Sequence, residues 1–158
     1  KTMIEIDIPG FRLLRLAHLV LDYNGTLAVN GDLIDGVKSR LDELAGDLSI
    51  HVITADTFGK AAHALAEVDC HLVILPPGNQ AVAKADYVRQ CGEQATVAIG
   101  NGRNDRLMLE QAALGIAVLG EEGIAVAAIM AADVVVRDGL SALDLLRHPQ
   151  RLVATLRS

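Results

Sequence analysis

The sequence is poor in the residues that aromatic cores, disulfide frameworks and membrane spans require. Aromatic residues make up 3% of the 158 residues and tryptophan is absent, although 51% of the chain is hydrophobic. Alanine, valine, leucine and isoleucine must therefore form the core, which suits close packing of helices on a sheet. Cys70 and Cys91 belong to no CxxC pair, which indicates free thiols in a reducing compartment.

The sequence also lacks membrane-spanning segments and a net positive charge, which limits where the protein is expected to act and what it is expected to bind. No apolar run is long enough to cross a bilayer and no stretch has the pattern of a signal peptide, so we expect a cytoplasmic protein without membrane insertion. The formal net charge of −6 argues against nucleic-acid binding. The length and the lack of a linker predict one domain over residues 1–158, with an extra strand within 1–10 and a helical tail over 141–158.

Short β-branched runs alternate with alanine-rich helical patterns. The expected strands are His18–Leu21, Ile50–Thr54, His71–Leu75, Thr96–Ile99, Ile116–Leu119 and Asp133–Val136. The expected helices are Ile34–Leu44, Gly59–Glu67, Gln80–Gln90, Asp105–Ala113 and Gly123–Ala131. Near-continuous apolar strands are typical of a parallel sheet covered on both faces. The alternation predicts an α/β fold, a doubly wound, Rossmann-like three-layer sandwich with a mainly parallel sheet.

The segment 18–28, HLVLDYNGTLA, is the most informative stretch of the chain. Its apolar run ends in Asp22, which a turn containing Gly25 follows directly. This places a carboxylate at the C-terminal tip of a strand, where open α/β sheets bind ligands. A carboxylate at this place can act as a nucleophile or as a ligand for Mg²⁺.

Other polar residues follow later elements of the pattern. Thr54 ends the second expected strand, Lys84 lies on the helix after the third, and the fourth runs into the segment 100–105, GNGRND. In a parallel sheet these positions converge on one edge. Together they supply a nucleophile, a hydroxyl, a cation, backbone donors and a second carboxylate, which are the groups that phosphoryl transfer needs.

These motif residues resemble those of the haloacid dehalogenase (HAD) superfamily of phosphohydrolases. More narrowly, the chain resembles the soluble relatives of P-type ATPase phosphorylation domains. Four motifs carry the resemblance in the family's order: LDYNGTLA (21–28), VITAD (52–56), KADYV (84–88) and GNGRNDRLML (100–109). The resemblance implies a HAD-type domain with a Mg²⁺ cofactor. In it Asp22 attacks phosphorus to form an aspartyl phosphate, while Thr54 and Lys84 hold the phosphate oxygens.

The resemblance also implies the remaining site residues. The metal ligands it implies are Asp22, Asn24, Asn101 and Asp105, and the substrate-binding residues are Gly25, Thr26, Ala55 and Arg103. Asn24 stands in the catalytic acid–base position and Asn101 in the first acidic position of the fourth motif, where the family's phosphatases usually carry aspartate. An amide does not exchange a proton near neutral pH and brings no charge to a metal. We therefore expect slow hydrolysis and weakened Mg²⁺ binding.

The spacers between motifs predict a capless member of the superfamily. About seven residues separate Leu27 from the first helix, and only Pro76–Asn79 separate the third strand from the next helix. Superfamily members place lid domains in these two gaps, and neither gap is long enough. An open site needs another way to exclude water, either a neighbouring subunit or a substrate large enough to form its own lid. We expect a neighbouring subunit and hence a homo-oligomer.

Several residues keep a plainer interpretation. Asp56 is expected to cap a helix rather than to catalyse, and Arg103 either steers a phosphate or lies in a solvated loop. His18, His51 and His71 show no metal-ligand spacing along the chain and are taken as structural or surface residues.

The leading hypothesis is a Mg²⁺-dependent phosphohydrolase acting on a phosphorylated small molecule or a phosphoprotein. The first alternative is a regulatory module, related to P-type ATPases, that binds phosphate or a partner with little or no turnover. The second is a receiver-like domain phosphorylated on Asp22, for which the acidic pair expected at the first strand's end is missing.

Overall fold

The computed structural model of the chain describes residues 1–55 and 59–158. Its centre is a six-stranded sheet in which every neighbouring pair is parallel. In spatial order the strands are β10 (Val134–Val136), β9 (Leu114–Val118), β8 (Thr96–Gly100), β3 (His18–Asp22), β6 (Ser49–Thr54) and β7 (His71–Ile74). The inner strands are buried along almost their whole length, because their continuous apolar runs face helices on both sides.

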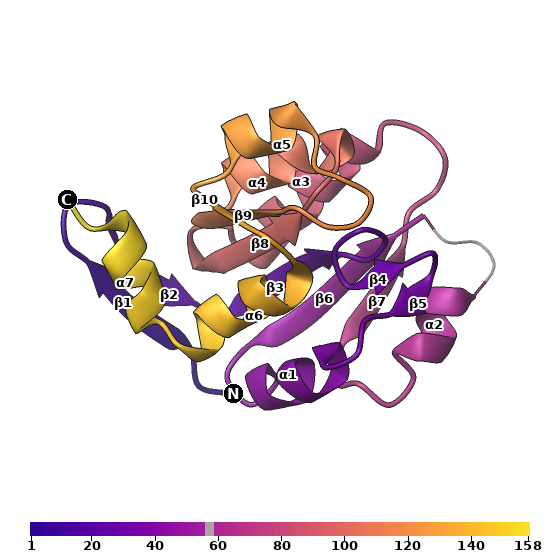
Figure 1. Cartoon of the computed structure of the whole chain (residues 1–158), viewed down its shortest axis with the longest axis horizontal. Coiled ribbons are helices and arrows are strands. Elements are labelled where there is room, and N and C mark those ends of the chain that lie inside the picture. The colour runs from indigo at the N-terminus through magenta and orange to yellow at the C-terminus, as the bar shows by residue number, and fades with distance from the viewer. Residues whose placement is uncertain (56–58) are drawn as a thin grey trace.

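Helices cover both faces of this sheet (Figure 1). On one face lie α3 (Gln80–Cys91), α4 (Arg106–Gln111) and α5 (Val126–Ala131), and on the other lie α1 (Val37–Leu44) and α6 (Gly139–Arg147). The remaining helical elements are α2 (Lys60–Ala64), α7 (Gln150–Leu156) and the 3₁₀ turns η1 (Glu93–Ala95) and η2 (Arg103–Asp105). Among the described residues, none of the helices combines the length and apolarity needed to cross a membrane.

The predicted strands and helices are present, with helix starts displaced at glycines. The first helix was expected from Ile34 but begins at Val37, because Gly36 has a φ of 94° and ends the preceding turn. The helix expected from Gly123 begins at Val126, since Gly123 has a φ of 82° and pairs with Gly120. The α-helix expected over 59–67 is confined to α2.

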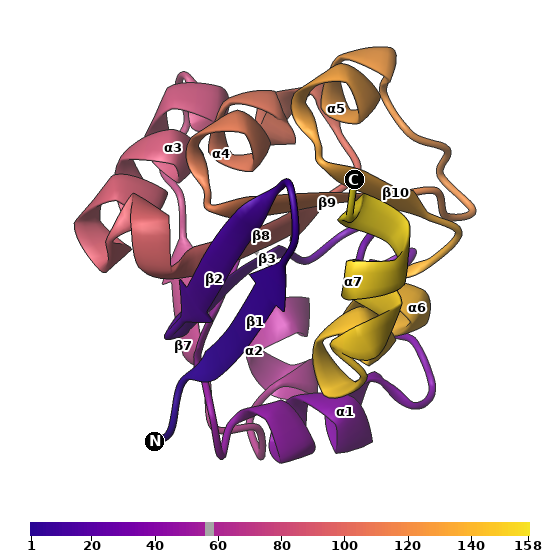
Figure 2. The same ribbon diagram turned by 90° about the vertical axis from the view of Figure 1, so that its left-hand side faces the viewer.

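The N-terminal region forms a hairpin outside the central sheet (Figure 2). The expected half-buried strand is β1 (Ile4–Ile8), which pairs antiparallel with β2 (Arg12–Leu16), a strand that the sequence analysis did not predict. Ile6 and Ile8 of β1 are buried in the same core as α7. The backbone N–H of Ser158 donates to the carbonyl oxygen of Pro9, which joins the end of the chain to the hairpin turn.

Both gaps in which a lid domain was considered are described in full and are short. The first holds only the hairpin of β4 (Ala28–Val29) and β5 (Asp32–Leu33). The second is the loop between Leu75 and the start of α3. The domain is therefore capless, as its spacers predict.

Candidate active site

The ends of β3 and β8 lie side by side where the winding of the sheet reverses. From β3 the chain continues to β6 and β7 on one side, and it returns to place β8 on the other side of β3. Such a switch point leaves a crevice at the carboxyl ends of the strands. Asp22 is the last residue of β3 and Gly100 is the last residue of β8, so the first and fourth motifs meet there.

Lys84 joins the two motif carboxylates. Its Nζ lies 3.0 Å from Oδ1 of Asp22 and 2.7 Å from Oδ1 of Asp105. The Lys84 side chain is 2% exposed, although a lysine on a helix is by default a solvated charge. Its position on α3 brings it over the end of the sheet, where it can serve both carboxylates at once. The tertiary structure thus gathers Asp22, Lys84 and Asp105 in one buried cluster.

The loop after β8 fixes the second carboxylate. Oδ2 of Asp105 accepts hydrogen bonds from the backbone N–H groups of Asn101, at 3.0 Å, and Gly102, at 2.9 Å. A Cβ atom at Gly100 would lie 2.5 Å from the Asp105 carboxyl group, so this close packing requires glycine. Asp105 is fully buried and directs its other oxygen at Lys84.

The electrostatics of the cluster disfavour full ionisation. Burial, and then the charge of Asp105, raise the pKa of Asp22 from its ordinary value of 3.8 to about 7, against the opposing effect of Lys84 and Thr26. Burial by itself would lower the pKa of Lys84, but the two carboxylates outweigh it and raise that pKa. One cation therefore neutralises only part of the charge that two buried carboxylates would carry.

The turn after Asp22 is held by its own hydrogen bonds. The hydroxyl of the fully buried Thr26 donates to Oδ2 of Asp22 at 3.3 Å, so this hydroxyl is engaged by the expected nucleophile. The N–H of Gly25, expected to serve phosphate, already donates to the carbonyl oxygen of Ala28 at 2.8 Å. Gly25 has a φ of 81° and packs against the Asn101 side chain, which brings Asn101 to the same turn.

The remaining predicted residues surround the cluster at different depths. Thr54 is buried at the end of β6, next to β3, whereas Asn24 and Ala55 are exposed. Arg103 is exposed in η2 and borders a separate shallow hollow beside the start of α3. Asp56 lies outside the described residues.

A pocket beside the Gly25–Thr26 turn contains residues that the sequence analysis missed. It has a volume of about 470 Å³ and is bordered by Leu119 to Glu121 and by Arg137 to Leu140. Arg137 and Glu121 are exposed and supply a cation and an anion at its rim. Arg137 follows strand β10 and Glu121 follows strand β9. Their position after the end of a parallel strand is the sequence feature that could have identified them.

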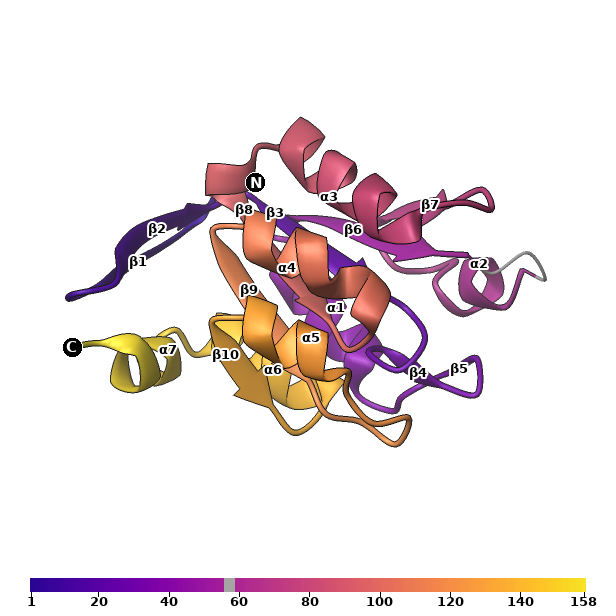
Figure 3. The ribbon, with the colours of Figure 1, turned by 90° about the horizontal axis from the view of Figure 1, so that it is seen from above.

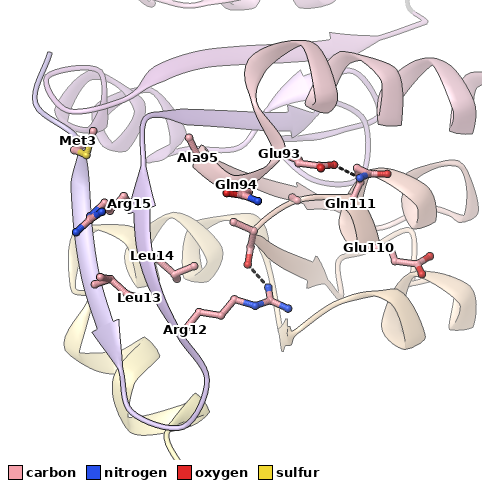
Figure 4. Close-up of a pocket in the computed structure, with 12 residues that line it drawn as sticks. Met3, Arg12, Leu13, Leu14, Arg15, Glu93, Gln94, Ala95, Glu110 and Gln111 are labelled. Atoms are coloured by element: carbon pink, nitrogen blue, oxygen red, sulfur yellow. Dashed lines mark hydrogen bonds between the residues drawn. The ribbon is translucent and has the colours of Figure 1, made fainter.

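A larger pocket of about 810 Å³ lies elsewhere, between the β1–β2 hairpin, η1 and the end of α4 (Figure 4). Arg12 crosses it and donates to the carbonyl oxygen of Ala113. None of the predicted site residues lines this pocket. The volume of a pocket therefore does not locate the acidic cluster in this protein.

No family model matches the chain. The uncharacterized protein MJ0073 of Methanocaldococcus jannaschii is 42% identical over 84 residues, which cover 51% of this chain and 90% of that protein. The chain and MJ0073 belong to one family.

Solved structures match the fold over most of its length. A putative HAD family hydrolase from Streptomyces avermitilis has a TM-score of 0.67 at 15% identity, covering 89% of this chain and 86% of that chain. The 3-deoxy-D-manno-octulosonate 8-phosphate phosphatase from Moraxella catarrhalis, in complex with magnesium ion, phosphate ion and KDO, has a TM-score of 0.65 at 14% identity, covering 90% and 94%. The chain has the HAD fold. The predicted doubly wound, capless HAD architecture is thereby confirmed.

Proposed function

We propose that this protein is a phosphohydrolase that depends on a divalent metal ion and forms an aspartyl phosphate on Asp22. The observation that carries the proposal is the buried cluster in which Lys84 Nζ lies 3.0 Å from Asp22 and 2.7 Å from Asp105, at the switch point of a HAD fold. This cluster supplies a nucleophile, a second carboxylate and a cation in one crevice.

The donor set of the cluster fits a hard divalent cation, which we propose to be Mg²⁺. Two buried carboxylates share a single ammonium, so one negative charge stays unbalanced when both are ionised, and burial and then Asp105 raise the pKa of Asp22. Asp22, the Asn24 carbonyl oxygen, Asp105 and Asn101 would hold the ion, the last two directly or through water, since Mg²⁺ binds oxygen ligands and keeps several waters. When bound, the ion neutralises charge on the transferred phosphoryl group.

In the first step the Asp22 carboxylate oxygen attacks phosphorus. A bond forms between that oxygen and phosphorus, and the ester bond to the leaving alcohol breaks. Thr26 orients the carboxylate through its hydroxyl, while Lys84 would neutralise charge on the equatorial oxygens and Thr54 would donate a hydrogen bond to them. The leaving oxygen takes its proton from water, because Asn24 offers no acid.

In the second step water attacks the phosphorus of the aspartyl phosphate. Inorganic phosphate leaves and the Asp22 carboxylate is regenerated. The exposed Asn24 side chain can orient this water by hydrogen bonds but cannot accept its proton, which passes to bulk water. The second step therefore limits turnover in this proposal.

The pocket beside Gly25 and Thr26 favours a small phosphorylated molecule as substrate. Its volume of about 470 Å³ falls in the range typical of small-ligand sites. Arg137 on its rim would pair with an anionic group of the leaving alcohol, while Glu121 would bind hydroxyl or amino groups. Since the fold lacks a cap, we further propose that a second copy of the chain covers the site, which light scattering would detect as a homo-oligomer.

Trapping of the intermediate tests the proposal directly. The protein is incubated with Mg²⁺ and acetyl phosphate, reduced with borohydride and analysed by mass spectrometry, which should place the label on Asp22. Asp22→Asn should abolish both the label and phosphate release from a panel of phosphate monoesters. Asp69→Asn, a change at an exposed aspartate, is the matched control and should alter neither. A label on another residue, or turnover retained by Asp22→Asn, would refute the mechanism.

The amides at positions 24 and 101 favour one competing function, a phosphate- or partner-binding regulatory module related to P-type ATPases. Such a module would bind phosphate with Mg²⁺ but release none from any ester of the panel. Steady-state phosphate release that depends on Asp22 would support the phosphohydrolase and exclude the binding module.

A further inference from the structure

A second cluster of potential metal ligands lies at the opposite end of the central sheet from Asp22. His18 is the first residue of β3, His51 lies early in β6, and Cys91 ends α3. In the parallel register His18 pairs with Ser49 and Val20 with His51, so both imidazoles stand on the same face as Val20, which packs in the core under α3. Figure 3 shows α3 running along β6 on that side of the sheet. Asp22 lies four positions after His18 on β3, which corresponds to about 13 Å along a strand.

The distances between the donor atoms of the three residues are close to those between the ligands of one metal ion. Nδ1 of His18 lies 3.1 Å from Nε2 of His51, and Sγ of Cys91 lies 3.8 Å from the same nitrogen. All three donor atoms lie within 4.8 Å of one another. A tetrahedral zinc ion with bonds of about 2.0 Å to nitrogen and 2.3 Å to sulfur requires ligand separations of about 3.3 to 3.5 Å. Small side-chain shifts therefore suffice to bring the donors onto one ion.

The surroundings of His51 hold its ring in the orientation that a ligand needs. Nδ1 of His51 lies 2.7 Å from the hydroxyl of Tyr87, on α3 one turn before Cys91. In the tautomer with its proton on Nδ1, the ring donates to Tyr87 and its Nε2 lone pair faces His18 and Cys91. Metal-bound histidines commonly make such a hydrogen bond through their second nitrogen. His71 stacks on His51, with ring centroids 4.9 Å apart, and packs the ring from the other side.

Burial supports the same assignment. His51 is 7% exposed, and His18 and Cys91 are half-buried. An ion held by these three residues would therefore be largely shielded from solvent.

We propose that His18, His51 and Cys91 form a second metal site, for a zinc-type transition ion with water in the fourth position. The two sites should prefer different metal ions because their ligands differ. Imidazole and thiolate ligands select zinc-like metals, whereas the carboxylate cluster at Asp22 suits Mg²⁺. The site joins β3, β6 and the end of α3, the helix that carries Lys84 seven residues earlier. The bound ion would therefore fix α3 on the sheet and help to position Lys84.

Cobalt titration tests this proposal independently of any phosphatase activity. The full chain is freed of metals with a chelator, reduced, and titrated with Co²⁺ in the presence of excess Mg²⁺. We expect one equivalent of Co²⁺ to bind with an intense thiolate-to-cobalt charge-transfer band and the visible bands of tetrahedral cobalt, and Zn²⁺ to abolish both. Cys91→Ser should remove the charge-transfer band, whereas Cys70→Ser, at the other free cysteine, should leave it unchanged.

Two further variants keep the result decisive if Cys91→Ser folds poorly. His18→Gln, at a half-buried position, should lower the Co²⁺ affinity strongly. Tyr87→Phe should lower it by about 10- to 100-fold, as expected for loss of an outer-shell hydrogen bond. Circular dichroism in chelator checks that each variant is folded. Failure of Co²⁺ to give a charge-transfer band, or loss of that band in Cys70→Ser but not in Cys91→Ser, would overturn the assignment.

Discussion

Asparagine in place of Asp22 removes one negative charge from the buried cluster while it keeps the size of the side chain and an oxygen that accepts hydrogen bonds. In the metal-free protein the pKa of Asp22 is raised from 3.8 to about 7, chiefly by burial and then by Asp105. An ionised Asp22 therefore costs free energy in the folded state. The substitution should stabilise the metal-free fold, by an amount that depends on pH.

The sign of the pH dependence follows from linkage. Below about pH 4 the carboxyl is protonated in both the folded and the unfolded chain, so the wild type and Asp22→Asn should be nearly equal in stability. Between pH 4 and 7 the unfolded chain loses the proton while the folded protein retains it, so the wild type loses stability as pH rises. Above pH 7 both states are ionised and the advantage of Asp22→Asn is complete.

The pKa difference sets the size of the effect. A shift of about three units corresponds to about 4 kcal/mol, at roughly 1.4 kcal/mol per unit. Relaxation of Lys84 around the new amide reduces this, so we expect a gain of about 2 to 4 kcal/mol at pH 8. For a chain of this length, such a gain raises the melting temperature by roughly 5 to 15 °C.

Urea and thermal unfolding between pH 4.5 and 8.5, with a chelator present, measure the difference. Asp69→Asn is again the control and should show no pH-dependent gain, because its carboxylate is exposed. Addition of Mg²⁺ should narrow the stability difference between Asp22→Asn and the wild type, since a ligand at 100 times its dissociation constant stabilises the protein that binds it by about 2.7 kcal/mol. A difference that does not change with pH, or a less stable Asp22→Asn at pH 8, would show that Lys84 fully compensates the Asp22 charge.

Three further predictions concern the same crevice. Asn24→Asp restores an acid–base group and should raise steady-state phosphate release about 100-fold, within the usual contribution of such groups; an unchanged rate would place the limiting step elsewhere. Asn101→Asp adds a charge and should tighten Mg²⁺ binding in titration calorimetry, whereas equal affinity would put Asn101 outside the coordination shell. Lys84→Met leaves two buried carboxylates without their shared cation and should cost about 3 to 5 kcal/mol at pH 8 in urea unfolding. That loss should be smaller at pH 5, where Asp22 stays protonated, and equal losses at both pH values would contradict the shared ion pair.

The sequence by itself determined the layered architecture and the motif residues. The near-continuous apolar runs of β3, β6 and β8 specify strands buried on both faces, because His51 of β6 is the one polar side chain in the interior of these three strands. The short gaps on either side of the second motif already excluded a cap. Asp22, Lys84 and Asp105 stand in recognisable motifs, so their importance was visible before their contacts were known.

The tertiary structure alone decided which side chains meet. The sequence did not show that Lys84 is shared by two carboxylates, that Thr26 bonds Asp22, or that β1 pairs with β2 outside the main sheet.

His18 and His51 are 33 residues apart in sequence, and His51 and Cys91 are 40 residues apart. No local spacing in the sequence could therefore predict their contact. Periodicity along a chain reports which face a residue occupies within its own element. Contacts between elements depend on strand register and on the helix packed above, and these are fixed only when the whole core assembles.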